Sequence, residues 1–553
     1  MVPEGVLEAD LNTFLTGFLL FSAQKCFEND RFRGVFLGVC HWFPKRVVSS
    51  RSCPARRILS LMNRASAIVL LIALGLIAYA NCYSKAFVFD DVGWILESPH
   101  FGDVREYVAS YPTRPLLMLS NWVIQHIGAY NPAPHHVLNV AIHLGSALTL
   151  FGLVWRTLRL PRFHGRYRQS AVCFGFAVAL LWMAHPIQTQ SVTYIIQRGE
   201  SMAGLFYLLI LYGLLRAETS WHHRRAWLAV SLVSLFLGFC SKEILMTAPG
   251  AVMLFDRVFL ATSVREMIRR RRGYYSLFLV IWGSFVSWHF MRALAVDKGI
   301  GFGMEAVTPR QYALTQCGVI LHYLRLSVWP VGQSIDYDGW PWCRTVGEAM
   351  PELAIIIGLL VITVVLLWKR PAAGFVAAWF FLILIPTSSF LPIVDPVFEH
   401  RLYLSLASVA VGVVWAGDWL LRNRPRIKIL VLFVIAGSLI ALTLRRNEDY
   451  RSGVTLWQSA LEQRPDNMRA KISLSHAYIT EGRGTEAIAL LTPLIECDPA
   501  NYLARHNLVV ALEMNGRLAE AEHHARVLTE QWPSDIGYQR MLAQVRAKMT
   551  ANP

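Results

Sequence analysis

The chain has 553 residues, of which 54% are hydrophobic and 16% charged, and its mean hydropathy is +0.39. A water-soluble domain needs a more polar surface, so this composition excludes an ordinary soluble enzyme and indicates a protein embedded in lipid. The net charge of +16 does not imply a nucleic-acid partner, because Arg and Lys cluster in short loops between apolar runs, where positive charge orients membrane proteins. The nine cysteines show neither CxxC pairs nor metal-ligand spacing, so no zinc site and no disulfide framework is predicted.

Three segments follow from the changes in composition: an N-terminal extension (1–61), an apolar domain (62–445) and a charged, Ala-rich domain (446–553). Met62 stands directly before a clean apolar run, a pattern typical of the start of a bacterial membrane protein. Two alternatives therefore stay open for residues 1–61: a poorly ordered extension, or a stretch upstream of the true start.

Apolar runs recur through the second segment, each near the roughly 20 residues that a helix needs to cross a bilayer. They predict an all-α bundle of about eleven spans, at 65–82, 136–155, 171–185, 199–216, 226–240, 244–260, 274–293, 351–368, 372–391, 402–421 and 427–444. The alternate loops are basic, which places the N-terminus in the cytoplasm and the residues after 444 outside. One more crossing before Lys369 would reverse the side of every later loop. This orientation therefore requires that residues 309–329 lie on the membrane surface or line a cavity.

With that orientation, Asp90 and Asp91 lie in the first outer loop, close to the membrane surface. A carboxylate there could take a proton from a hydroxyl group, the pair could share a divalent metal ion, or the two could simply cap a helix. Other polar groups gather at outer helix ends, where ionisable side chains usually face a protein cavity. These candidates are His185, Arg198, Glu200, Lys242, Glu243, Glu399, His400 and Arg401.

His135, Asn139 and His143 share one helix face by their spacing of four, and Arg114 precedes a semi-apolar stretch. We expect this face to look into the bundle, where it could bind substrate or hold helices together by hydrogen bonds. A lipid phosphate requires a permanent cation, which favours Arg198 and Arg401 over the histidines.

The C-terminal segment repeats at a spacing of 34 residues, the period of tetratricopeptide units. Pro465, Pro499 and Pro533 keep this register, as do the pairs Asn467/Asn501, Gly482/Gly516, Glu486/Glu520 and Ala487/Ala521. The pattern predicts a short α-solenoid of two complete repeats, with half a repeat before them and a capping helix after them. Such arrays bind peptides or partner helices.

Several motifs together resemble the transmembrane and tetratricopeptide repeat-containing O-mannosyltransferases and their bacterial relatives. They are Phe87-Val-Phe-Asp-Asp91, Arg114-Pro-Leu-Leu, Asn131-Pro-Ala-Pro-His-His136 continuing to His143, His185-Pro with Arg198-Gly-Glu200, Ser241-Lys-Glu243, Glu399-His-Arg-Leu-Tyr403 and Arg446-Asn447. The chain departs from the eukaryotic members in its short repeat array and in Gly199-Glu200, where Ala-Asp is expected.

The resemblance implies a GT-C-type membrane fold and an inverting transfer of sugar from a polyprenyl-phosphate carrier to Ser or Thr of exported proteins, with Asp90 or Asp91 as base. It implies no redox cofactor, and it places the protein in a bacterial inner membrane with the repeats on the periplasmic side. Two alternatives remain: a non-enzymatic scaffold that recruits an exported partner, and a polymerase or ligase of surface polysaccharide.

Overall fold

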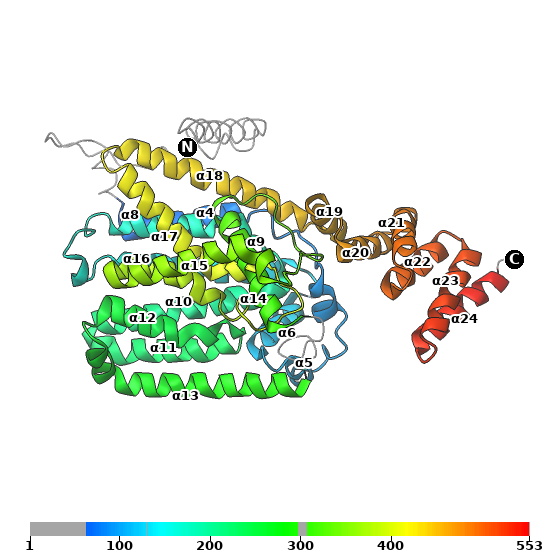
Figure 1. Ribbon diagram of the computed structural model, residues 1–553, viewed down its shortest axis with the longest axis horizontal. Helices are drawn as coiled ribbons and strands as arrows, with labels where there is room; N and C mark the ends of the chain where they lie inside the picture. Colours follow the sequence, from blue (N-terminus) through cyan, green and yellow to red (C-terminus); the bar gives the residue numbers. More distant parts are fainter. Residues whose placement is uncertain (1–61, 129, 297–306, 552–553) are drawn as a thin grey trace.

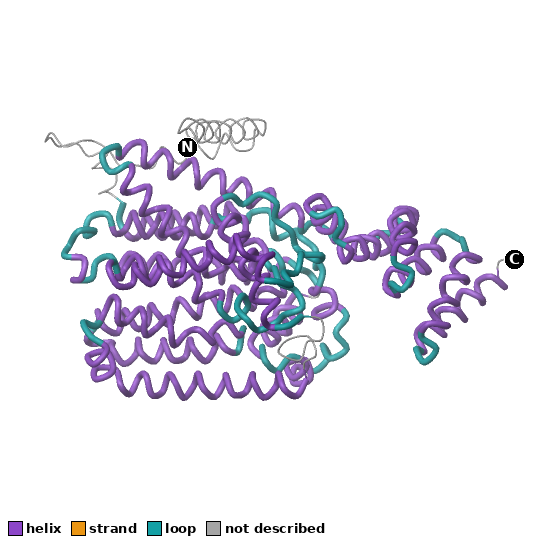
Figure 2. Tube along the Cα trace, viewed as in Figure 1, coloured by secondary structure: helices purple, strands orange, loops and turns teal. Residues whose placement is uncertain are grey.

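The computed structural model describes residues 62–128, 130–296 and 307–551, so the two alternatives for residues 1–61 lie outside the described residues. Within these ranges every regular element is helical and no strand forms (Figure 2), as the sequence predicts. A large helical bundle carries a slender helical array that projects from one of its ends (Figure 1).

Thirteen of the described helices build the bundle, with α13 and α18 at its two opposite edges (Figure 1). They are α4 (Arg64–Ala78), α6 (Pro115–Gly128), α7 (Ala133–Thr157), α8 (Ala171–Met183), α10 (Arg198–Thr219), α11 (Arg224–Phe239), α12 (Ala248–Phe255), α13 (Val264–Val296), α14 (Pro309–Val328), α15 (Val346–Lys369), α16 (Pro371–Leu384), α17 (Leu402–Leu420) and α18 (Pro425–Asp449). The short helices α5 (Val104–Ser110) and α9 (Thr189–Val192) lie in connections.

Five described helical segments are long and apolar enough to cross a membrane: Ala133–Thr157, Ile195–Thr219, Val346–Lys369, Glu399–Leu420 and Pro425–Asp449. A sixth candidate is Ala171–Met183 with Pro186–Val192, two pieces bent by 55°. The apolar helices α4 and α16 are shorter. The described residues thus support a membrane protein, whereas the count of eleven spans stays a prediction.

The structure divides one predicted span into shorter pieces. Residues 244–260 are divided among the 3₁₀ turn η6 (Glu243–Thr247), α12 and the π turn η7 (Asp256–Leu260). Residues 309–329 form α14, whose Tyr312 and Tyr323 hydroxyls donate to the carbonyls of Thr387 and Phe398. This helix supports a loop at residues 385–398, and its place relative to the membrane stays a prediction.

Burial separates central helices from peripheral ones. The most apolar part of segment 195–219 is 61% buried, whereas that of α15 and of α18 is only 11% buried despite a higher mean hydropathy of 2.6 against 1.3. Helices that are apolar on all sides yet exposed in the protein fit a lipid environment. Helix α10 is therefore the central element, and it carries polar residues at both ends.

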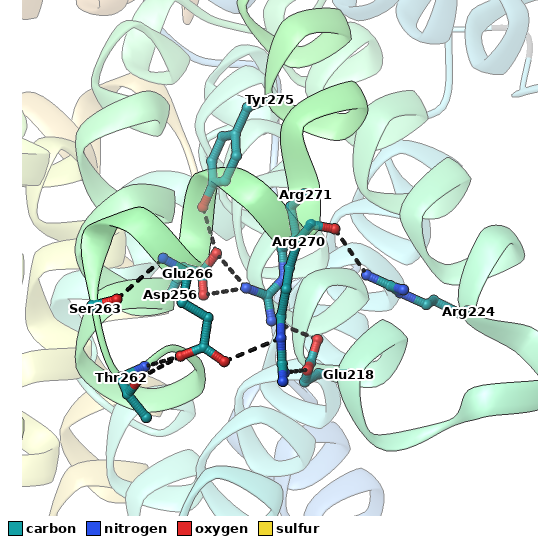
Figure 3. A network of polar contacts seen from close by, with 9 residues as sticks. All are labelled: Glu218, Arg224, Asp256, Thr262, Ser263, Glu266, Arg270, Arg271 and Tyr275. Atoms are coloured by element: carbon teal, nitrogen blue, oxygen red, sulfur yellow. Dashed lines mark hydrogen bonds and ion pairs between the residues drawn. The ribbon is translucent and has the colours of Figure 1, made fainter.

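At one end of α10, an ionic network joins α10, α13 and the π turn η7 (Figure 3). Arg271 donates to both oxygens of Asp256 at 2.8 and 3.0 Å and to Glu218 at 2.5 Å, and the hydroxyl of Tyr275 donates to Asp256 at 2.6 Å. The backbone of Arg271 leaves the helical region (φ −130°, ψ 23°), so α13 kinks where this side chain turns inward. The network fixes α13 to α10 and to the π turn η7.

The C-terminal array consists of α19 (Gly453–Gln463), α20 (Met468–Thr480), α21 (Gly484–Cys497), α22 (Tyr502–Met514), α23 (Leu518–Gln531) and α24 (Ile536–Ala551). Asn467 and Asn501 cap α20 and α22 by accepting from the N–H groups three residues ahead, at 2.7 and 3.0 Å. Gly482 and Gly516 take positive φ angles of 78° and 71° in the turns, a conformation that favours glycine. The 34-residue register thus has one structural cause in both repeats. Helix α18 runs through Asp449, past the predicted domain boundary at 445/446.

Candidate functional site

The first turn of α10 is the point where the predicted site residues meet. Here the backbone N–H of Ile196, in the 3₁₀ turn η4 (Ile195–Gln197), donates to Asp91 at 2.7 Å. The second oxygen of Asp91 accepts from the N–H of Val88 at 3.2 Å, and the residue is fully buried. Burial raises the pKa of Asp91 to about 8, although both hydrogen bonds oppose this shift. Asp91 therefore fastens the loop after α4 to the start of α10 and does not face solvent.

Asp90, its neighbour, is exposed. Its N–H donates to the hydroxyl of Tyr194 at 3.1 Å. The preceding residue, Phe89, has a φ of +53°, which is uncommon for a bulky residue and costs energy. Protein crowding around Asp90 raises the pKa of its carboxyl group, while Tyr194 and Arg469 counter the rise. The two adjacent acids thus have different surroundings, and only Asp90 is open to a ligand.

The strained turn is held by aromatic contacts that come from far along the chain. The Phe89 ring stacks on Tyr194 at 6.1 Å and meets Trp457 edge-on at 5.0 Å between centroids. Trp457 lies in α19, the first helix of the repeat array, and is 4% exposed. The loop that carries Asp90 is consequently packed against the repeats.

Arg198 is fully buried, and neutral groups of α6 and α7 accept from all of its nitrogens. Its Nε donates to Asn139 at 2.5 Å, and the other two nitrogens reach His135, Asn121 and Ser120 at 2.9 to 3.3 Å. A guanidinium group has five N–H donors, and these five contacts engage them. In this conformation Arg198 has no free N–H group to donate to a phosphate, so its predicted role in binding a donor phosphate stays a prediction. Its contacts instead join α10 to α6 and α7. The face of His135, Asn139 and His143 is buried in the bundle, as expected.

Four further predicted residues form two ion pairs beside this turn. Arg114 contacts Glu243 through two hydrogen bonds of 3.0 and 3.1 Å, and Lys242 lies 2.7 Å from Glu200. Burial opposes the charge of Glu243, yet Arg114 lowers the pKa of Glu243 to about 2. The side chains of Arg114 and Lys242 remain 23% and 12% exposed, so these two cations are more accessible than Arg198.

The segment Glu399–Arg401 supports two loops, one at residues 334–337 and one at residues 395–396. Glu399 accepts from the hydroxyl of Tyr337 at 2.6 Å and the N–H of Ser334 at 2.7 Å. Arg401 donates to the carbonyls of Asp395 and Pro396 at 2.8 and 2.7 Å. All three side chains of the segment are buried, and His400 contacts Gln190. Arg401 is therefore occupied by backbone carbonyls, and the prediction of a phosphate ligand there has no direct support.

Sequence reasoning missed the cation that joins these two loops to the repeats. Arg469, in the first turn of α20, lies 2.9 Å from Asp336 and 2.8 Å from Asp395. Asn467 also donates to Asp336, at 3.1 Å. The sequence contained one sign of this contact, because the equivalent position one repeat later is an apolar residue, Leu503. An arginine at that position departs from the repeat and serves a contact outside it.

The last predicted residue, His185, is buried and supports a turn of its own segment. Its Nδ1 accepts from the N–H of Ile187 at 3.3 Å and caps the turn η3 (Pro186–Gln188). Among the described residues, no group of three or more His, Cys, Asp or Glu side chains has the arrangement to hold a metal ion. The site is therefore built from the first loop, the start of α10, the residues after α11, and α20.

Two tetratricopeptide-repeat family models match residues 439–502 and 479–545. The human protein O-mannosyl-transferase TMTC4 is 24% identical over 495 residues, which cover 75% of this chain and 64% of the relative. Human TMTC1 is 23% identical over 528 residues, or 82% of this chain and 58% of the relative. The chain is therefore similar to protein O-mannosyl-transferases of the TMTC type over most of its length.

The chain spans less than two thirds of the length of these relatives. Among solved structures, ArnT from Cupriavidus metallidurans bound to undecaprenyl phosphate is similar at 15% identity, with a TM-score of 0.37 and coverage of 83% of this chain and 79% of that one.

Proposed function

We propose that this TMTC-like chain is a membrane glycosyltransferase of the GT-C type that moves a sugar from a polyprenyl-phosphate carrier to hydroxyl groups of exported proteins. One observation carries the proposal: Asp90 is exposed at the point where the membrane bundle meets the repeat array, held there by Phe89 and Trp457. A carboxylate at that point can act on a polypeptide bound by the repeats and on a lipid held by the bundle.

In the proposed reaction, the acceptor hydroxyl oxygen forms a bond to the anomeric carbon of the sugar while Asp90 accepts its proton. The bond between that carbon and the phosphate oxygen breaks, and polyprenyl phosphate leaves with the electron pair. A single displacement of this kind inverts the anomeric centre. The developing phosphate charge is stabilised by Arg114 and Lys242, the accessible cations beside the first turn of α10.

Asp91 and Arg198 act as positioning residues in this proposal. Both are fully buried, and each joins α10 to another part of the site, Asp91 to the first loop and Arg198 to α6 and α7. In this way they fix the position of Asp90 relative to Arg114 and Lys242. A loop under backbone strain at Phe89 needs such support, because strain persists only where surrounding contacts over-determine it.

The test uses cells that lack the gene and carry it back as Asp90→Asn, Asp91→Asn or Asp103→Asn. Asp103 belongs to the same loop but only caps α5, by accepting from Arg105 N–H at 2.6 Å. We expect Asp90→Asn to remove the sugar mass from exported proteins at normal membrane abundance, as deletion does, while Asp103→Asn keeps it. If deletion of the gene leaves every protein glycan in place, the non-enzymatic scaffold is supported instead. If deletion removes only a surface polysaccharide, a polymerase or ligase is supported.

A further inference from the structure

A cavity lies at the far end of α7 from the site described above. It has a volume of about 430 Å³ and opens between α4, α7 and α10. Its lining residues are Arg64, Ala65, Ile68, Leu148, Phe151, Gly152, Trp155, Arg156 and Tyr212. His135 and Arg156 are 21 residues apart on α7, so at the helical rise the cavity is roughly 30 Å from the proposed reaction centre.

Positive charge without a counter-ion from the described part of the chain distinguishes this cavity. The guanidinium groups of Arg64, Arg156 and Arg159 lie 4.9, 4.6 and 5.9 Å from the centroid of Trp155. Among the described residues, none of these three arginines takes part in a salt bridge, whereas Arg271 at the same end of the bundle contacts two acids. Stacking on an aromatic ring holds a cation in place but does not neutralise it.

Hydrogen-bond donors at the cavity also lack acceptors. Trp155 is 6% exposed, and its indole Nε1 has no partner in the described structure; the same holds for the Nε of Arg156. Buried donors without acceptors are costly, and most are satisfied by protein, water or a ligand. An anionic oxygen provides both the missing acceptor and the missing charge.

The remaining wall of the cavity is apolar. Ile68, Leu148 and Phe151 line it one and two turns deeper along α4 and α7, and Ile68 is 38% exposed. The arginines occupy the first turn of α4 and the last turn of α7, which is the depth of a membrane boundary. A ligand that fits has an anionic head and an apolar tail that follows the helices into the bilayer.

We propose that this cavity binds an anionic glycerophospholipid of the surrounding bilayer, with its phosphate between Arg64 and Arg156 and one acyl chain against Ile68 and Phe151. This site is independent of the proposed transferase reaction. It lies at the end of the bundle away from the repeats and takes a structural lipid that stays bound when the protein leaves the membrane.

The experiment counts bound lipids on the full-length protein by native mass spectrometry, with phosphatidylglycerol and phosphatidylcholine of identical acyl chains as probes. We compare wild type with Arg64→Gln/Arg156→Gln and with a matched control, Arg166→Gln/Arg168→Gln. The control removes the same charge from exposed positions of the next loop that do not line the cavity. Gel filtration verifies that each variant is folded.

We expect wild type and the control to keep one phosphatidylglycerol at least tenfold more tightly than phosphatidylcholine, and the cavity variant to lose that preference. Trp155→Phe, which keeps the ring but removes the N–H, should weaken the preference severalfold, and it serves as the test if the double variant does not fold. Equal losses in cavity variant and control would overturn the proposal, as would the absence of any preference in wild type. Displacement of the lipid by millimolar inorganic phosphate would show a site for a free anion instead.

Discussion

Replacing Arg469 by Ala should loosen the junction between the repeat array and the bundle. The guanidinium group bridges Asp336 and Asp395, which belong to the two loops that Glu399 and Arg401 support. Asp336 is 1% exposed, so without Arg469 a buried carboxylate keeps only Asn467 and the backbone as partners. Burial already raises the pKa of Asp336, and Arg469 counters that rise.

The magnitude follows from the exposure of the two partners. Exposed ion pairs contribute about 0.2–1 kcal/mol, whereas breaking a buried pair costs about 3–5 kcal/mol. Arg469 is 32% exposed and Asp336 nearly buried, which places the loss near the middle, at about 2 kcal/mol. Such a change increases the open fraction of the junction up to ~30-fold. The repeats themselves should keep their stability, because Arg469 makes these contacts outside them.

Hydrogen exchange on the purified full-length protein measures this opening directly. Peptides that contain residues 333–339 should exchange up to ~30-fold faster in Arg469→Ala, and less so in Arg469→Lys, which keeps the charge. The matched control is Arg483→Ala, since Arg483 pairs with Glu481 and Glu486 inside its own repeat. Unchanged exchange of residues 333–339 in folded Arg469→Ala, or equal acceleration in the control, would refute the reasoning.

Three further predictions concern single contacts. Asn467→Ala should destabilise the protein by more than the ~1 kcal/mol expected for a lost helix cap, because Asn467 also donates to Asp336. In chemical denaturation it should also lose more stability than Asn501→Ala, which removes a cap alone. Equal losses would contradict a contribution of Asn467 to the contact between repeats and bundle. Asp256→Ala should cost up to about 3 kcal/mol, because it leaves Arg271 buried with only Glu218 as an acidic partner. The double replacement Asp256→Leu/Arg271→Met should cost less in thermal unfolding, and the reverse order would be evidence against the network. The pKa of Asp91 in the folded protein is raised to about 8, whereas an Asp in the unfolded chain releases its proton near pH 4. The contribution of Asp91 to the free energy of unfolding therefore falls as pH rises from about 4 to 8. Asp91→Asn should flatten that fall, and identical pH profiles of unfolding in wild type and variant would contradict the assignment.

The repeats were predictable in detail because each repeated letter has a local cause. Asn467 and Asn501 are caps, Gly482 and Gly516 take positive φ angles, and Ala487 and Ala521 are fully buried at helix crossings. All of these are decided within a few residues of sequence. The lengths of the membrane helices were less predictable, because hydropathy does not show where a helix breaks. Residues 244–260, for example, are apolar enough to predict one span but form two short turns and a short helix.

The roles of individual site residues depended on contacts from distant parts of the chain. Nothing in the pair Asp90-Asp91 indicates which acid is buried; that is decided by the positive φ of Phe89 and by Tyr194 and Trp457, more than 100 and 360 residues away. Likewise, the charge of Arg198 suggested a phosphate ligand, while its five contacts to α6 and α7 use the donors that a phosphate would need. Composition identifies polar groups at one depth but not their partners.

The central claim is that Asp90 removes a proton during sugar transfer at the junction of bundle and repeats. The most direct test incubates the purified chain in lipid nanodiscs with the proposed donor, a polyprenyl-phosphate sugar, and with Ser- and Thr-containing peptides. Mannose is the sugar to use first, because the relatives are named O-mannosyl-transferases. We predict transfer to peptide hydroxyls by wild type and Asp103→Asn, and none by folded Asp90→Asn. Transfer by Asp90→Asn at the wild-type rate would contradict the account.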